Sequence, residues 1–370
     1  MHYLFVYCII EKDLRLDFIR RMDMLVLAIA VAFVASIILT PIVRKFAFII
    51  GAVDRPNYRK VHVSVMPRIG GLAIIGGFLV GYLLLTPEDE HATGIFIGAV
   101  IIVITGFLDD MLEITAKTKI AGQLAAAIVV VTWGGLQIEF INLPFGGIVE
   151  FGFLSIPVTI LWIVGITNAI NLLDGLDGLA AGVSTIALIS LSVMAMIMGD
   201  TFVVATTTIL AASSLGFLFY NFYPAKIFMG DTGALFLGFM ISVLALLGFK
   251  NVTFISLVIP VIMLGVPISD TFFTIVRRIR MKQPISKPDK SHLHHNLLNA
   301  GFSHRQSVLI IYAIATLFGV GAILFSQATP WGGLLLIFIM LLAIELIVEV
   351  IGLAGSNYRP ILNLVRMIGK

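Results

Sequence analysis

The chain has 370 residues, of which 59% are hydrophobic and only 12% are charged. Because a soluble domain typically carries about 25% charged residues, this composition excludes a soluble globular enzyme and a disordered tail protein. The small net charge of +3 argues against a nucleic-acid partner, and the single cysteine, Cys8, excludes a disulfide framework and a cysteine-rich metal centre. The sequence therefore predicts a polytopic membrane protein.

Eleven apolar stretches, taken in chain order, come close to or reach the ~17–25 residues that a membrane-spanning helix needs. They cover residues 24–46, 70–85, 93–108, 120–136, 156–173, 179–198, 202–220, 233–248, 253–276, 308–325 and 331–353. The predicted fold class is an all-α membrane bundle at residues 24–353, followed by a basic cytoplasmic tail at residues 354–370.

Residues 1–23 precede the first span and carry four basic side chains, at Lys12, Arg15, Arg20 and Arg21. Two interpretations remain open: a native extension, or a start site placed too far upstream of Met22 or Met24. The apolar run at residues 1–10 is too short to span a membrane. It also lacks the basic region and cleavage site of a signal peptide.

The orientation follows from the basic residues. If the segments between spans alternate in side, most of the 24 Lys and Arg residues fall on the same side, which the positive-inside rule places in the cytoplasm. The N-terminus is then outside and the C-terminus is cytoplasmic. Residues 137–153 alternate apolar and polar positions around a proline and two glycines, which predicts a short β-hairpin on the outer face.

The acidic residues of the cytoplasmic side gather at the ends of the spans, where a carboxylate is costly and functional by default. Three polar clusters stand out, containing Asp109 and Asp110; Asn168, Asn171, Asp174 and Asp177; and Asn221 and Asp231. Their oxygen-bearing side chains are suited to Mg²⁺, and their mutual repulsion, about 3 kcal/mol per pair at 5 Å, requires a cation. Solvated helix ends and polar caps are the structural alternatives.

The segment at residues 277–305 is the longest cytoplasmic one and holds His292, His294, His295 and His304 among seven basic residues. This composition indicates a site for a diphosphate or a lipid phosphate, and a neutral histidine there can also carry a proton. A loop lying on anionic headgroups is the alternative. Arg68 belongs to a second basic segment. Asp270 is expected to pair with Arg277 or Arg278, and Glu345 and Glu349 stay unassigned.

Five motifs carry a resemblance to a known family: PRIGG, GFLDD, NAINLLDGLDGLAAG, NFYPAKIFMGDTGALFLG and DKSHLHHNLLNAGFSHRQ. Together they resemble the polyprenyl-phosphate N-acetylhexosamine-1-phosphate transferase superfamily. The resemblance implies that residues 24–353 form a catalytic domain in the bacterial inner membrane, with its active site on the cytoplasmic face. It also implies transfer of a sugar 1-phosphate from a UDP-sugar to a polyprenyl phosphate, with Mg²⁺, or Mn²⁺ in its place, and release of UMP.

HLHH and PRIGG are similar to the undecaprenyl-phosphate GlcNAc-1-phosphate transferase branch, which starts teichoic acid, O-antigen and related glycans. The peptidoglycan branch typically has three consecutive histidines and PTMGG, so UDP-GlcNAc is favoured over UDP-MurNAc-pentapeptide. An ion-coupled transporter is the competing class. It would place acids at mid-membrane in repeated, broken helices, which the sequence does not show.

The resemblance assigns roles residue by residue. The residues expected to be catalytic are Asp109, Asp110, His294 and His295, with one acid of the pair as base for the lipid phosphate. Asn171 and Asp231 are expected around the metal. The expected substrate-binding residues are Arg68, Lys119, Asn168, Asp174, Asp177, Asn221 and His292. Which histidine of HLHH is essential stays open, as does a homodimer.

Overall fold

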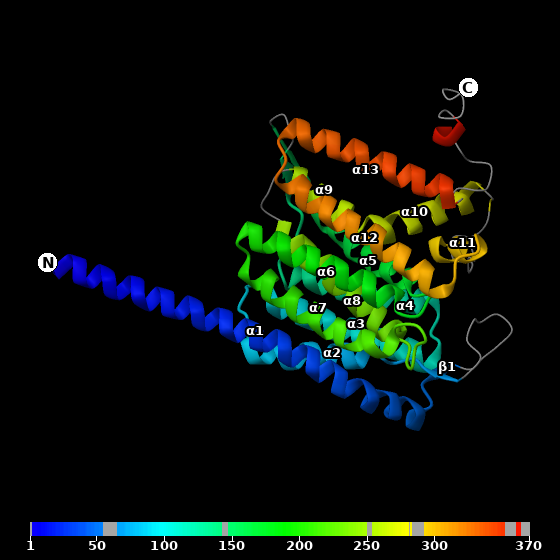
Figure 1. The fold of residues 1–370 in the computed structure, drawn as a ribbon, viewed down its shortest axis with the longest axis horizontal. Coiled ribbons are helices and arrows are strands. Elements are labelled where there is room, and N and C mark those ends of the chain that lie inside the picture. The colour runs from blue at the N-terminus through cyan, green and yellow to red at the C-terminus, as the bar shows by residue number, and fades with distance from the viewer. Residues whose placement is uncertain are drawn as a thin grey trace.

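The computed structural model describes residues 2–54, 65–142, 147–249, 254–280, 282, 292–351 and 360–363, and all that follows concerns these residues. The chain is almost entirely helical, and its helices run roughly alongside one another (Figure 1). The helices are α1 (His2–Ile50), α2 (Gly71–Leu85), α3 (Ala92–Leu112), α4 (Ala116–Thr132), η1 (Gly152–Leu154), α5 (Ser155–Leu173), α6 (Leu179–Met198), α7 (Thr201–Asn221), α8 (Gly230–Phe249), α9 (Phe254–Met263), α10 (Gly265–Arg280), α11 (Leu293–Asn299), α12 (His304–Ser326) and α13 (Pro330–Ile351).

Eight helices in the described part of the chain are long and apolar enough to cross a membrane, and α2 is apolar but shorter. The chain is therefore a multi-pass membrane protein. A helix lies at each position where the sequence predicts a span, while the count of eleven spans and their orientation stay predictions. Helix α1 continues through the predicted extension without a break from His2.

The ninth predicted span differs from the expectation, because it consists of two helices that meet at Leu264. Pro267 explains the break: it has no N–H to donate to the carbonyl of Met263, and its ring crowds that carbonyl. Hydrophobicity alone does not reveal this interruption, because the apolar run continues across it.

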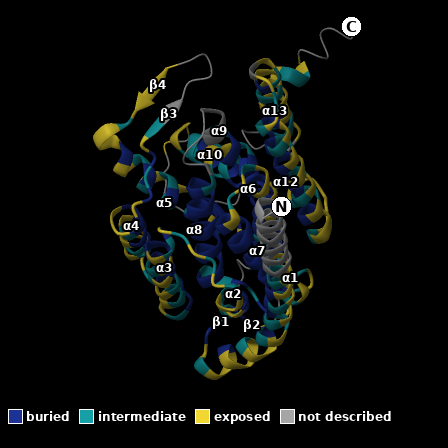
Figure 2. Cartoon of the chain, turned by 90° about the vertical axis from the view of Figure 1, so that its left-hand side faces the viewer, coloured by how far each residue is buried: buried dark blue, intermediate teal, exposed yellow. Residues whose placement is uncertain are grey.

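Helix α8 lies at the centre of the bundle and is buried along its length, with α2, α3, α5 and α7 around it (Figure 2). Glycines allow the neighbouring helices to come close. A Cβ atom on Gly106 of α3 would lie 2.6 Å from the Cα atom of Thr232 in α8, and Gly71 of α2 lies against the backbone of Gly233. Such close contact at small residues is a common way for membrane helices to pack.

Two short antiparallel pairs complete the fold: β1 (Val53–Asp54) with β2 (Met66–Pro67), and β3 (Phe140–Asn142) with β4 (Ile148–Glu150). The residues between β3 and β4 lie outside the described part, so the predicted outer hairpin stays a prediction. After β2 the chain bonds to the segment before α8. The N–H of Phe228 donates to Pro67 at 2.8 Å, and the N–H of Gly70 donates back to Phe228 at 3.0 Å. These bonds hold the PRIGG segment next to the start of α8.

Candidate active site

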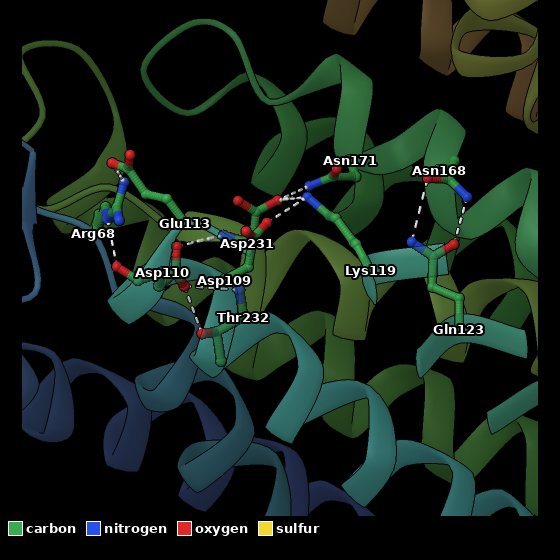
Figure 3. A network of polar contacts seen from close by, with 10 residues as sticks. All are labelled: Arg68, Asp109, Asp110, Glu113, Lys119, Gln123, Asn168, Asn171, Asp231 and Thr232. Carbon is green, nitrogen blue, oxygen red and sulfur yellow. Dashed lines mark hydrogen bonds and ion pairs between the residues drawn. The ribbon is translucent and has the colours of Figure 1, made fainter. Parts of the chain in front are cut away.

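The candidate site lies at one end of the bundle, where α3, α4, α5 and α8 meet. The last turn of α3 holds Asp109 and Asp110, the first turn of α4 holds Lys119, the last turn of α5 holds Asn171, and the first turn of α8 holds Asp231. Figure 3 shows these side chains gathered around one point. The fold thus brings together residues from three helix ends that the sequence predicts separately, and it places Lys119, which the resemblance assigns to substrate binding, between their carboxylates.

Asp110 binds the N-terminus of α8. Its Oδ1 atom accepts the N–H of Asp231 at 3.0 Å, and its Oδ2 atom accepts the N–H and the hydroxyl of Thr232 at 2.9 and 2.6 Å. The residue is only 2% exposed. A carboxylate at this place satisfies helix N–H groups that have no intrahelical partner and interacts favourably with the helix dipole. Asp110 therefore fixes α3 to α8 and sets the position of Asp231.

Lys119 lies between the other two carboxylates. Its ammonium is 2.9 Å from Oδ2 of Asp109 and also bonds to Oδ1 of Asp231, which accepts a further bond from Nδ2 of Asn171 at 2.6 Å. Burial by itself lowers the pKa of the Lys119 ammonium, but the carboxylates of Asp231 and Asp109 outweigh it, and the pKa lies above its usual value. The side chain therefore stays charged and balances the acids.

The donor set is suited to Mg²⁺. Among the described residues, no three His, Cys, Asp or Glu side chains converge as a complete metal site. What the site offers is carboxylate and amide oxygen, from Asp231 and Asn171. Mg²⁺ takes one or two carboxylates and fills its other positions with water and substrate phosphates, whereas structural zinc needs four protein ligands. The residues therefore fit the predicted metal.

Arg68 joins the network at the end of α3, through the main chain of Asp110 and the side chain of Glu113 (Figure 3). Its Nε atom donates to the carbonyl of Asp110 at 2.7 Å, and Nη1 lies 3.2 Å from Oε1 of Glu113. The side chain thus holds the end of α3, while the backbone bonds of PRIGG hold Arg68 itself.

The DGLDG turn, residues 174–178, joins α5 to α6. Asp174 is exposed, whereas Oδ2 of Asp177 accepts the N–H of Ala225 at 2.9 Å. Asn221 is buried and donates to the carbonyl of Ile227 at 3.0 Å, so its amide shapes the loop that leads to α8. The structure places Asp174 where a ligand can reach it and gives Asn221 a role inside the protein.

The histidine motif begins α11 and faces the same turn. Oδ2 of Asp270 lies 2.9 Å from Nδ1 of His292, and Oδ1 accepts the N–H of Leu293 at 2.7 Å. Asp270 thus orients the motif, a role that the sequence did not assign to it. The ring of His294 lies against Gly175, leaving no room for a side chain there, and contacts the ring of His295 at 4.3 Å between centroids. Burial, with His295 next, lowers the pKa of His294 to about 3, so the imidazole is neutral.

Asn168 lies one turn from Asn171 but pairs within the bundle. Its amide and that of Gln123 exchange hydrogen bonds, and Nδ2 of Asn168 also donates to the carbonyl of Val164 at 2.8 Å. Gln123, which is 1% exposed, was not predicted from the sequence as a site residue. The sequence feature that could have indicated its role is that Gln123 is the single amide side chain in the apolar helix α4. Thr232, beside Asp231 in the motif, was missed as well.

Comparisons with known proteins identify the family. The model of glycosyl transferase family 4 matches residues 92–249. A probable undecaprenyl-phosphate N-acetylglucosaminyl 1-phosphate transferase from Bacillus subtilis is 50% identical over 353 residues, which cover 95% of this chain and 98% of that protein. The chain belongs to glycosyl transferase family 4. The matched region of this family 4 transferase runs from α3 to α8 and so includes the acids and Lys119.

More distant relatives extend the similarity. A decaprenyl-phosphate N-acetylglucosaminephosphotransferase from Mycolicibacterium smegmatis is 36% identical over 76% of this family 4 transferase and 77% of its own length. An undecaprenyl-phosphate alpha-N-acetylglucosaminyl 1-phosphate transferase from Escherichia coli K12 is 29% identical over 80% of the chain and 83% of its own length.

Proposed function

We propose that this family 4 transferase moves GlcNAc-1-phosphate from UDP-GlcNAc to undecaprenyl phosphate. The observation that carries the proposal is the position of Lys119 between the carboxylates of Asp109 and Asp231, where the ends of α3, α4, α5 and α8 meet. The names of the relatives from B. subtilis and E. coli support the choice of sugar and lipid. The product, a lipid-linked sugar diphosphate, would start a cell-wall or surface glycan such as teichoic acid or O-antigen.

In the proposed step, an oxygen of the lipid phosphate attacks the β-phosphorus of UDP-GlcNAc. The bond from that phosphorus to the bridging oxygen breaks, and UMP leaves. Catalysis of such a transfer consists mainly of positioning and charge neutralisation. Lys119 binds the lipid phosphate, and Asp109 receives its proton, because the carboxylate of Asp110 is engaged at the N-terminus of α8. A covalent phosphosugar on an aspartate is the alternative, and its detection in the absence of lipid would exclude direct attack.

Asp231 and Asn171 are the residues that would hold Mg²⁺. When bound, the ion supplies positive charge to the diphosphate and to the departing UMP. The amide of Asn171, which bonds to Asp231 at 2.6 Å, fixes the orientation of that carboxylate.

We also place the protein in the bacterial inner membrane with this site on the cytoplasmic face. The support is the distribution of Lys and Arg along the sequence, which is concentrated in the segments on the side of the acids.

The test is UMP release by the purified protein in detergent. We expect release only when UDP-GlcNAc, undecaprenyl phosphate and Mg²⁺ are all present, and no release with UDP-MurNAc-pentapeptide. Asp231→Asn, which keeps the side chain's shape and removes its charge, should lower kcat by about 10²–10³. The matched control is Glu150→Gln, an exposed residue of β4, which should retain full activity. Full activity in Asp231→Asn would reject the site, and release without lipid would reject the reaction.

A further inference from the structure

Helix α12 lies outside the matched family region and reaches the DGLDG turn with two side chains. Nε2 of His304 accepts the N–H of Asp177 at 3.0 Å, and the hydroxyl of Tyr312 donates to the carbonyl of Gly178 at 2.5 Å. Residues eight apart are about 2.2 turns from each other and point about 80° apart, so both lie within one broad face of a helix. One face of α12 therefore bonds to the backbone of two successive residues of the turn.

The turn is shaped to receive this helix. Gly178 has a φ of +77°, a conformation that glycine adopts without strain, and it caps the N-terminus of α6. One turn further along α6, the ring of Tyr312 occupies the space that a side chain on Gly182 would need. Gly182 therefore makes the room through which the Tyr312 hydroxyl reaches the carbonyl of Gly178.

His304 also joins this turn to the loop before α8. Its ring stacks on Tyr223 with 4.5 Å between centroids, and Ala225 of the same loop donates its N–H to the carboxylate of Asp177. Asp177 is thus bound through both its main chain and its side chain. The loop continues into Asp231, so α12 holds the two segments that flank the acids.

We propose that His304 and Tyr312 are positioning residues for the donor nucleotide sugar, acting through the DGLDG turn. This inference rests on the proposed function. The turn presents the exposed carboxyl group of Asp174, whose oxygens accept hydrogen bonds from hydroxyl and N–H groups. UDP-GlcNAc carries many such donors on its uracil, ribose and sugar, whereas a lipid phosphate carries at most the one proton that Asp109 receives. Displacement of the turn should therefore weaken donor binding and spare the acceptor.

The experiment measures KM for each substrate in two variants. Tyr312→Phe removes only the hydroxyl, and His304→Phe removes the acceptor nitrogen while keeping an aromatic ring to stack on Tyr223. Each should raise KM for UDP-GlcNAc about five- to tenfold, the effect of one hydrogen bond. KM for undecaprenyl phosphate should stay within twofold of wild type, and so should kcat.

Two further variants act as controls. His304→Gln keeps a side-chain oxygen that can accept the N–H of Asp177 and should restore most of the donor KM. Thr316→Val removes a hydroxyl of α12 that bonds only to the carbonyl of Tyr312, at 2.8 Å, and should leave both KM values unchanged. Because His304 and Tyr312 act on one turn, the effect of the double variant should be smaller than the product of the single effects.

The outcomes separate this inference from the proposed function. If the wild type releases no UMP from UDP-GlcNAc, the proposed function fails. If the wild type is active and the donor KM is unchanged in both phenylalanine variants, the positioning role is overturned. Equal changes in the two KM values would also overturn it. Thermal unfolding of each variant in detergent identifies a folding defect, and where one of Tyr312→Phe and His304→Phe has such a defect, the donor KM of the other decides.

Discussion

Asp109 and Asp110 are adjacent in sequence but bind different partners. Neighbouring residues of a helix point about 100° apart, so two adjacent carboxylates can serve different partners. The structure places Asp109 against Lys119, and Asp110 against the first N–H groups of α8. The sequence cannot reveal the second contact, because no local pattern indicates which distant helix ends beside α3. The same limit explains why Gln123 was missed as the partner of Asn168.

Because His294 is buried, we expect the stability of the protein to depend on pH. Burial lowers its pKa to about 3 in the folded protein, against about 6.5 in an unfolded chain. Between these values the unfolded state binds more protons, so the contribution of His294 to the free energy of unfolding is greatest above pH 6.5 and falls as the pH drops. From pH 8 to pH 5.5 the loss should be about 1 kcal/mol.

The measurement is chemical unfolding in detergent at several pH values, for wild type and His294→Phe. The variant lacks the titrating group, so its free energy of unfolding should fall less over this range. Equal pH dependence in the two proteins would contradict the prediction, whatever their difference in absolute stability.

The helices could be predicted from the sequence more completely than the contacts of the site could. Apolar runs of about 20 residues are a strong signal, because the backbone of a membrane segment must satisfy its own hydrogen bonds. The break at Leu264 was missed because Pro260 and Pro267 stand in an otherwise continuous apolar run. The packing of α3 on α8 depends on Gly106, whose importance is visible only once Thr232 is beside it.

The close contact between α3 and α8 at Gly106 can be tested by substitution. Gly106→Ala places a methyl group where the backbone of α8 stands, 2.6 Å from the Cα atom of Thr232, so the two helices must separate. We expect a loss of about 1–3 kcal/mol in the free energy of unfolding, together with reduced activity, since Asp110 loses its bonds to α8.

Gly165→Ala in α5 is the matched control, because a Cβ atom there meets nothing within 4 Å. It should be neutral or stabilising by up to about 1 kcal/mol through helix propensity. Thermal or chemical unfolding and UMP release report both effects. Equal behaviour of the two alanine variants would show that the contact between α3 and α8 is unimportant.

For the whole molecule, the distribution of charge predicts the orientation. The site gathers at one end of the bundle, and the chain reaches the other end at β4 after crossing along α4. Because basic residues are concentrated in segments on the side of the site, that side should face the cytoplasm.

Cysteine labelling tests this orientation. In a Cys8→Ser background, which removes the single cysteine, Lys117→Cys and Glu150→Cys introduce thiols at exposed positions near opposite ends of α4. A membrane-impermeant maleimide should label Glu150→Cys in intact spheroplasts and Lys117→Cys in inverted vesicles. The reverse pattern would contradict the orientation, and labelling of both from one side would contradict the passage of α4 across the bundle.

The bonds from Asp110 to the start of α8 have a consequence for biosynthesis. The two residues joined by the bond from the N–H of Asp231 are 121 positions apart in the chain. During translation, α3 enters the membrane long before α8 exists, and Asp110 has no helix terminus to bind. Among the described residues, Arg68 and Lys119, which bond to the end of α3, are synthesised before α8. The end of the bundle that holds the candidate site is therefore completed only when the ribosome has passed α8, although most of its acids were made far earlier.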